Sequence, residues 1–244
     1  VATFGPDGKF LGETKVEAPK YVSIHPKTGA MYVLTHPGEI KQNKPRPFAL
    51  IKFDQAVEGK EVARLALEGT DPVLALDPGA DPARLWLQNS GLFPVDDRGD
   101  KLEPGANVIK PVAGGFAGPL YMCVDPARER LYVADFRLNI VAVDLKTGKS
   151  QPFMKASEPA VDRDGNVYVL DAFGANSLSR YSPDGKPLPF ATGSHKLSIK
   201  FRNGLPNVGV KGLTVAPTGD IFAYQDNNTA GGMRRKQNVI CASL

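Results

Sequence analysis

The chain has 244 residues, of which 42% are hydrophobic, and a net charge of +4. This length is sufficient for one sizeable core, and the composition is that of a globular protein. No window approaches eighteen consecutive apolar residues, which excludes a membrane-spanning helix, and the 25 glycines and 21 prolines favour strands and turns over helices.

The ends of the chain and its cysteines give two further expectations. The first residue is Val1, and no segment has the features of a signal peptide, so we expect a chain that is processed, truncated at both ends or cut from a larger protein. Cys123 and Cys241 lie in expected strands far apart in sequence. We interpret both as small buried residues rather than as a disulfide.

Short apolar segments follow one another in pairs, and each pair is joined by a turn that carries Pro, Asp or Gly. Alternating β-branched and aromatic residues in these segments predict antiparallel strands. No run of ten or more residues has helical periodicity. In chain order the pairs cover residues 1–13, 21–35, 49–67, 72–89, 92–102, 120–135, 140–153, 159–171, 178–190 and 212–225, and a last strand is expected in 238–244.

The pairs recur with a regular period. Pairs with an aromatic residue in their second segment begin at residues 21, 72, 120, 159 and 212, at spacings of 39 to 53 residues. Four strands per period of this length indicate the blades of a β-propeller. The sequence therefore predicts an all-β fold and a single propeller domain over 1–244, built from four-stranded antiparallel blades. If the first pair completes the last blade, the chain forms five blades.

Repeats such as PAVDRDGNVYVLDAFGANSLSRYSPDGKPLPF, residues 159–190, resemble NHL-type blades. The chain resembles the NHL-repeat and gluconolactonase-like β-propellers in pattern over nearly its whole length. The resemblance implies a closed ring of six blades, so six are favoured for the intact molecule, and it favours a periplasmic or secreted protein. A fold-level resemblance implies little about activity.

Three long insertions fall between strand pairs or blades, at 36–47, 192–210 and 226–237, and they are basic. Because strands alternate in direction, we expect these insertions on one face of the propeller and the short turns on the other. Their only acidic residues are Glu39 and Asp226. We assign as candidate ligand-binding residues Lys44, Arg46, Lys196, Lys200, Arg202, Arg234 and Arg235.

The charge of the insertions has two interpretations. They form a face that attracts an anion, such as a partner protein, an acidic glycan or a lipid head group, or they are ordinary solvated loops. Only Phe48 and Phe201 lie near the basic residues, which argues against binding of single-stranded nucleic acid.

Carboxylates at strand ends near the expected channel mouth suggest a calcium site, because Ca²⁺ prefers oxygen ligands. Gluconolactonase-like enzymes use such a metal to polarise a lactone carbonyl, and Glu158 lies where they place a metal-binding glutamate. Together with Asp171 and Asp226, which follow second strands near the same mouth, Glu158 is a candidate ligand. Two observations argue against this site. These enzymes present an asparagine of an Asn-Gly-Leu stretch on an inner strand, whereas Asn203 of the same stretch here lies in an insertion. In addition, strand-end acids also act as turn formers.

Three functions remain open, and no catalytic residue is assigned. The first is a non-enzymatic binding or scaffold propeller that presents the basic insertions. The second is a calcium-dependent lactonase-type hydrolase, and the third is a structural domain of a larger extracytoplasmic protein. We expect His25 to serve a turn, because His25-Pro26 corresponds to Asp77-Pro78 and Asp125-Pro126, and we expect Trp86 to lie in the core.

Overall fold

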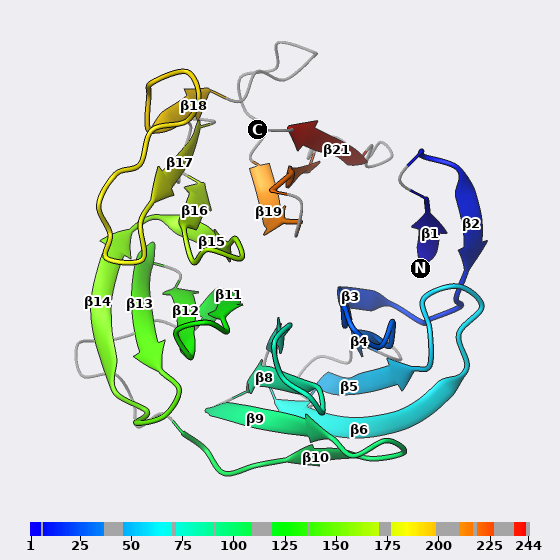
Figure 1. Cartoon of the computed structure of the whole chain (residues 1–244). Helices are drawn as coiled ribbons and strands as arrows, with labels where there is room; N and C mark the ends of the chain where they lie inside the picture. Colours follow the sequence, from blue (N-terminus) through cyan, green and yellow to red (C-terminus); the bar gives the residue numbers. More distant parts are fainter. Residues whose placement is uncertain are drawn as a thin grey trace. The chain divides into compact units, whose positions relative to one another are not determined.

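The computed structural model describes residues 1–5, 7–36, 46–69, 72–89, 91–108, 119–135, 137–170, 177–198, 210–216, 219–226 and 237–242. Over these residues the chain consists of strands and their connections, without a helix (Figure 1). A search of this part for a helix that could cross a membrane finds none. The all-β prediction is confirmed.

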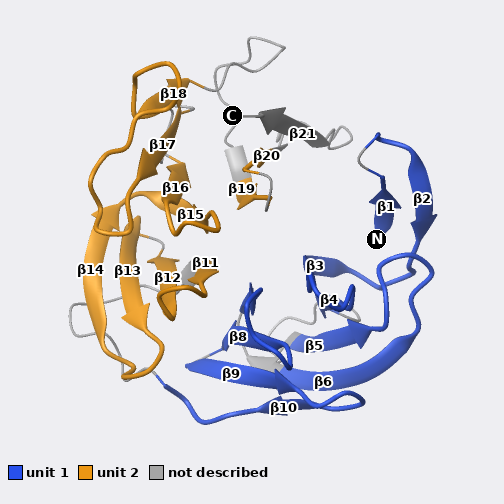
Figure 2. Ribbon diagram, in the orientation of Figure 1, with its two compact units in different colours: residues 1–111 blue, residues 112–244 orange. Residues whose placement is uncertain are grey.

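The chain divides into two compact units, Val1–Pro111 and Val112–Leu244 (Figure 2). Each unit contains consecutive antiparallel sheets whose strands pair in chain order. The prediction of a single domain over 1–244 stays a prediction.

Unit 1 contains three sheets. Sheet A pairs β1 (Ala2–Phe4) with β2 (Phe10–Glu13). Sheet B consists of β3 (Pro19–Ile24), β4 (Met31–Thr35), β5 (Arg46–Phe53) and β6 (Glu61–Gly69). Sheet C consists of β7 (Val73–Asp77), β8 (Arg84–Gln88), β9 (Leu92–Asp97) and β10 (Leu102–Pro104).

Unit 2 contains three further sheets. Sheet D consists of β11 (Pro119–Asp125), β12 (Arg130–Asp135), β13 (Asn139–Asp144) and β14 (Ser150–Lys155). Sheet E consists of β15 (Ser157–Val161), β16 (Val167–Leu170), β17 (Ser177–Tyr181) and β18 (Lys196–Ser198). Sheet F consists of β19 (Val210–Val215), β20 (Ile221–Asp226) and β21 (Gln237–Ala242).

Within each unit, neighbouring sheets pack face to face. The first strands lie side by side, β3 against β7 in unit 1 and β15 against both β11 and β19 in unit 2. Between sheets B and C, Tyr32 and Leu34 share a buried core with Leu85 and Leu87. Side chains on successive residues of a strand point to opposite faces, so the full burial of β4 and β16 shows that both faces of each strand are covered.

In four of the five pairs that begin with a first strand, the aromatic residue of the second strand is a core residue, whereas Phe222 of β20 is only partly buried. Tyr32, Trp86, Tyr132 and Tyr168 occupy this place in β4, β8, β12 and β16, and each is at most 3% exposed. The expectation that Trp86 belongs to the core is confirmed. Aromatic side chains fit here because each contributes a large apolar area to the layer between two sheets.

The predicted strand pairs are observed with one exception. Nine pairs and the last strand are found, but the second segment of 178–190 was expected at Pro187–Phe190 and the paired strand is β18 at Lys196–Ser198. Pro187 and Pro189 lack the N–H that a ladder requires, and Pro187 makes only an isolated bridge to Tyr181. Phe190 is instead buried against Tyr168.

Four sheets, B to E, have the predicted four strands. Sheet A has two strands and sheet F has three over the described residues. The expectation of five to six blades stays a prediction. Cys123 on β11 is a free thiol, but it is only partly buried rather than buried as expected, and the side chain of Cys241 lies outside the described residues.

Candidate functional site

Because neighbouring strands run in opposite directions, the connections between strands lie at the two ends of the strands, and we treat these two sides of each sheet separately. We call "hairpin edge" the edge with the turns β3–β4, β7–β8, β11–β12, β15–β16 and β19–β20 and with the third-to-fourth connections. We call "insertion edge" the opposite one, where second strands lead to third strands and one sheet leads to the next. Residues 36–45 join β4 to β5, 199–209 join β18 to β19, and 227–236 join β20 to β21. These three connections therefore start and end at the insertion edges of their sheets, and the prediction that all three insertions share one face of the propeller stays a prediction.

The shift of β18 corrects the second insertion. Lys196 was expected in a loop, but it lies on β18, exposed, opposite Ser179 of β17. Residues 182–195, which include a turn at Ser182–Gly185, form a long connection on the hairpin edge. The expectation that this edge carries mostly short turns is wrong for sheet E.

Of the other basic candidates, only Arg46 has a described backbone position. Arg46 is the first residue of β5, and its side chain lies outside the described part of the structure. The remaining candidates lie outside the described residues altogether: Lys44, Lys200, Arg202, Arg234 and Arg235.

Of the three candidate calcium ligands, the structure describes the side chain of Glu158 alone. Asp171 and the side chain of Asp226 at the end of β20 lie outside the described residues. Glu158 is 4% exposed and has a φ of 45°. It lies within a β-bulge of β15, between the paired residues Ser157 and Ala160.

The bulge at Glu158 belongs to a recurring feature of the fold. β3, β11 and β19 also have a bulge near their first residues. In β19 the corresponding residue is Gly212, with a φ of 76°, between the paired residues Lys211 and Leu213. A left-handed φ suits glycine and costs a non-glycine residue about 1 kcal/mol. A buried glutamate in a backbone position suited to glycine is thus the most unusual feature of this strand.

Asp135, the carboxylate after β12, has a structural role. Its Oδ1 accepts the backbone N–H groups of Arg137 and Asn139 at 2.9 and 2.8 Å, and the Asn139 side-chain amide donates to both carboxylate oxygens. This arrangement closes the β12–β13 loop, as strand-end acids commonly do. Among the described residues, no group of three His, Cys, Asp or Glu side chains is placed to hold a metal ion.

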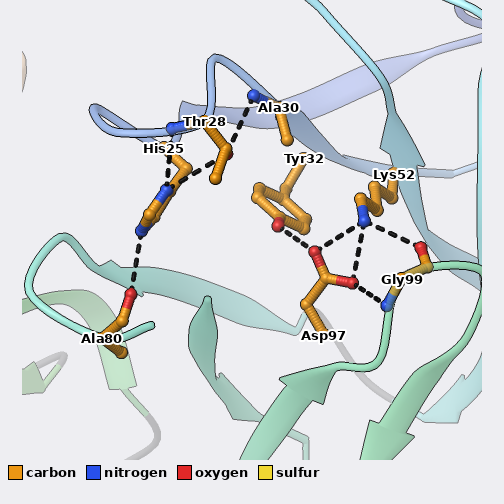
Figure 3. A network of polar contacts seen from close by, with 8 residues as sticks. All are labelled: His25, Thr28, Ala30, Tyr32, Lys52, Ala80, Asp97 and Gly99. Carbon is orange, nitrogen blue, oxygen red and sulfur yellow. Dashed lines mark hydrogen bonds and ion pairs between the residues drawn. The ribbon is translucent and has the colours of Figure 1, made fainter. Parts of the chain in front are cut away.

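A buried polar network lies at the hairpin edge between sheets B and C (Figure 3). Lys52 of β5 donates to Asp97 at 2.8 Å and to the Gly99 carbonyl at 2.7 Å. Tyr32 donates to Asp97 Oδ2 at 2.5 Å, and the Gly99 amide donates to Asp97 Oδ1. Three strands from two sheets thus contribute to one buried carboxylate.

The carboxylate and the phenol in this network titrate abnormally. Burial by itself raises the pKa of Asp97, but the bonds from Lys52, Tyr32 and Gly99 outweigh burial and hold it below its usual value. Burial and the neighbouring Asp97 raise the pKa of Tyr32 far above its usual range. Asp97 is therefore an ionised acceptor and Tyr32 a neutral donor at physiological pH.

Side chains of one turn also bond backbone carbonyls of the next sheet. His25 is fully buried; its Nδ1 accepts the Thr28 amide, so Nε2 carries the hydrogen and donates to Ala80 O at 3.0 Å (Figure 3). Lys27 donates to Gly79 O. The turn role expected for His25 is confirmed.

Arginines of the β11–β12 hairpin make the equivalent bonds in unit 2. Arg128 Nη1 lies 3.2 Å from Asp125 Oδ2 and donates to Asp164 O at 3.0 Å, and Arg130 Nη1 donates to Pro183 O at 2.9 Å. A hydrogen bond with a charged donor is stronger than a neutral one. The hairpin edges therefore join neighbouring sheets by bonds from cationic or imidazole side chains to turn carbonyls.

Comparison with known proteins identifies the fold. No protein-family model matches the chain, and no curated protein matches its sequence. The tail fiber of Staphylococcus aureus phage P68 is 15% identical with a TM-score of 0.53, and the match covers 94% of this chain and 51% of that chain. A structural genomics protein of unknown function from Bacteroides thetaiotaomicron is 12% identical with a TM-score of 0.58, over 89% of this chain and 59% of that chain.

The beta-propeller domain of Cps50 (Swd1) from Myceliophteria thermophila is 9% identical with a TM-score of 0.56, over 94% of this chain and 73% of that domain. The chain spans about half the length of the phage tail fiber chain. Identities this low establish the fold alone, and that fold is a β-propeller. Membership of the NHL-repeat or gluconolactonase-like group stays a prediction.

Proposed function

We propose that this chain is a non-enzymatic binding propeller that presents its basic insertions to an anionic ligand or to an acidic surface of a partner protein. The observation that carries the proposal is the concentration of charge on the insertions. Residues 36–47, 192–210 and 226–237 hold nine Lys and Arg and two acidic residues, a net charge of +7. The whole chain has +4, so all other residues together carry −3.

In contrast to the net positive charge of the insertions, basic side chains at the hairpin edge of sheet C are paired with acidic ones. In sheet C, Asp96 pairs with Arg84 at 2.7 Å and with Arg98 at 3.0 Å, and Glu103 pairs with both Arg98 and Lys101. Positive charge there is balanced within the protein. An excess of one sign on one set of loops instead attracts partners of the opposite sign and accelerates their association.

Charge reversal in unit 2 tests this function. We expect the variant with Glu at Lys196, Lys200, Arg234 and Arg235 to lose salt-sensitive retention on immobilised heparin and on immobilised polyglutamate. The reason is that counterion release on binding a polyanion scales with the number of cations engaged. The measurement is the salt concentration at which each variant elutes.

A matched control variant separates local charge from net charge. Reversal of Lys9, Lys101, Lys146 and Arg163 also changes four cations to Glu, but on turns between paired antiparallel strands outside the insertions, where these side chains are 67 to 82% exposed. The control should elute close to the wild type. Equal losses in both variants would make the retention a consequence of net charge and would reject the proposal.

Glu158 supports a second candidate, a calcium-dependent hydrolase of the lactonase type. Its buried carboxylate can serve as one oxygen ligand of Ca²⁺, and the proposed further ligands are Asp171 and Asp226. A glutamate in a left-handed position costs stability, which favours a role for its side chain. Calcium, when bound, would polarise a carbonyl of the substrate.

Calcium addition tests the second candidate. A ligand that binds only the folded state stabilises it by mass action, so saturating Ca²⁺ should raise the melting temperature of the wild type by about 5 °C. The Glu158→Gln variant should lose this rise. Its own melting temperature without calcium is the baseline for the comparison. An unchanged melting temperature at millimolar Ca²⁺ removes the hydrolase candidate.

A further inference from the structure

At the insertion edge of sheet B, an imidazole and an ammonium both lie near one aromatic ring. His36 follows β4, and its ring packs edge-on against Phe48 of β5 with centroids 4.7 Å apart. Lys20 of β3 places Nζ 5.7 Å from the centroid of the same Phe48 ring and 5.4 Å from that of Tyr21. Three neighbouring strands thus contribute to one small cluster around Phe48.

The imidazole in this cluster has an unmet hydrogen-bonding need. His36 Nε2 is buried and has no hydrogen-bond partner among the described residues. A buried polar atom without a partner costs about 1–3 kcal/mol, and such atoms are rare enough in native proteins to need an explanation. By contrast, His25, which is fully buried, has bonds at both of its ring nitrogens.

The backbone holds the cluster in place. The His36 amide donates to Ala18 O at 3.1 Å, and Ala18 has a left-handed φ of 42°. A bulge between Pro19 and Tyr21 follows directly and leaves Lys20 as the extra residue. Bulges change the direction of a side chain, and this one places Lys20 over the aromatic rings. The positions of both nitrogen-bearing side chains are therefore set by the fold.

We propose that His36, Lys20 and Phe48 form a binding site for one anionic group, a carboxylate or a phosphate. The anion accepts a hydrogen bond from His36 Nε2, and the Lys20 ammonium supplies the opposite charge beside it. Phe48, 3% exposed, forms the apolar wall and limits access of water. The choice of an anion rests on the proposed function, to which this site adds a discrete contact in unit 1.

Imidazole NMR tests the site directly, because the chain has three histidines. Inorganic phosphate and acetate are titrated separately into the protein at constant ionic strength, and the imidazole nitrogen signals are followed. His36→Gln assigns the signal of interest. We expect a saturable shift of the His36 signal alone, and the probe that saturates at lower concentration identifies phosphate or carboxylate as the preferred group.

Substitution of Lys20 tests the second half of the site. Lys20→Gln should weaken the affinity about tenfold, because a charge-assisted contact is lost, and Lys20→Arg should retain it. Lys20 is exposed but its Nζ also donates to Pro72 O at 3.3 Å, so circular dichroism verifies that both variants fold. Equal shifts of all three histidines, a shift without saturation or an unchanged affinity in Lys20→Gln overturns the proposal.

The reversal variant at Lys196, Lys200, Arg234 and Arg235 separates this site from the proposed function. If it loses retention on heparin but keeps the His36 shift, both proposals stand. If the wild type is retained on heparin but shows no His36 shift, only the site fails. A His36 shift in a protein that heparin does not retain supports the site and rejects the wider binding function.

Discussion

Asp97 shows how a single residue joins two sheets in unit 1. Its carboxylate is 7% exposed and accepts bonds from Tyr32 and Lys52 of sheet B, while its own backbone belongs to sheet C. A buried charge is tolerated only when it is paired and hydrogen-bonded. The three side chains therefore depend on one another, and loss of one leaves a buried charge or donor unsatisfied.

Asp97→Asn should lower the free energy of unfolding by about 3 kcal/mol at pH 7, because Lys52 is left without its counter-charge. The pKa of Asp97 is lowered in the folded protein, so its contribution is fully present above the unfolded-state pKa and is lost as pH falls through the folded-state pKa. The difference between the urea midpoints of variant and wild type should thus shrink below about pH 4.

Asp7→Asn is the matched control for this substitution. Asp7 also pairs with a lysine, Lys9, but its side chain is 54% exposed. Solvent screens such a pair, so little change is expected. A pH-independent difference between Asp97→Asn and the wild type would contradict the role assigned to the ionised carboxylate.

At the scale of the element, the hairpin turns both reverse the chain and join neighbouring sheets. Gly165 in the β15–β16 turn has a φ of 82°, and a Cβ built there would lie 1.7 Å from Arg128 Nη1. The absence of a side chain thus lets the Arg128 guanidinium reach the carbonyl of Asp164. The turn needs glycine both for its backbone and for this close approach.

Gly165→Ala should destabilise the protein by about 2 kcal/mol, about half from the left-handed backbone and half from the displaced Arg128. Gly193→Ala is the control, because Gly193 has a φ of 80° and open space around it. Addition of Arg128→Ala should reduce the effect of Gly165→Ala to that of the control. Chemical denaturation measures the two glycine variants, Arg128→Ala and the double variant, and equal effects of Gly165→Ala and Gly193→Ala would argue against the clash.

Sheet E shows where local pattern and packing disagree. The segment at Pro187–Phe190 has the apolar pattern of a strand, yet two prolines deprive it of ladder donors. The chain therefore places Phe190 into the core against Tyr168 and forms the outer strand later, at Lys196–Ser198. The outer strand could not be identified from periodicity, because three residues are too few to show one.

At the scale of the whole molecule, the repeated sheets predict a repeated pattern of stability. The second strand of each four-stranded sheet is paired on both sides and buried on both faces, whereas the outermost strands have one neighbour. Buried, doubly paired strands open only with the global unfolding of their surroundings.

Hydrogen–deuterium exchange should thus be slowest in β4, β8, β12 and β16, and faster in the outer strands β6, β10, β14 and β18. Mass spectrometry of peptic peptides measures this pattern. The strand β2 of the two-stranded sheet, whose Phe10 is 60% exposed, provides a fast-exchanging reference. Protection that followed position along the chain instead of position within a sheet would contradict the repeat.

The sequence by itself determined most of the strands and their pairing, because these follow from alternation and from turn residues that act over short distances, but it misplaced the outer strand of sheet E and with it residues 192–195. It also identified the aromatic core positions and the basic insertions, although the described residues place Lys196 on a strand. Only the tertiary structure decided which polar groups meet. Tyr32 and Asp97 are 65 positions apart, and His25 and Ala80 are 55 apart. Such contacts depend on how one sheet stacks on the next, and no local pattern of residues encodes that distance.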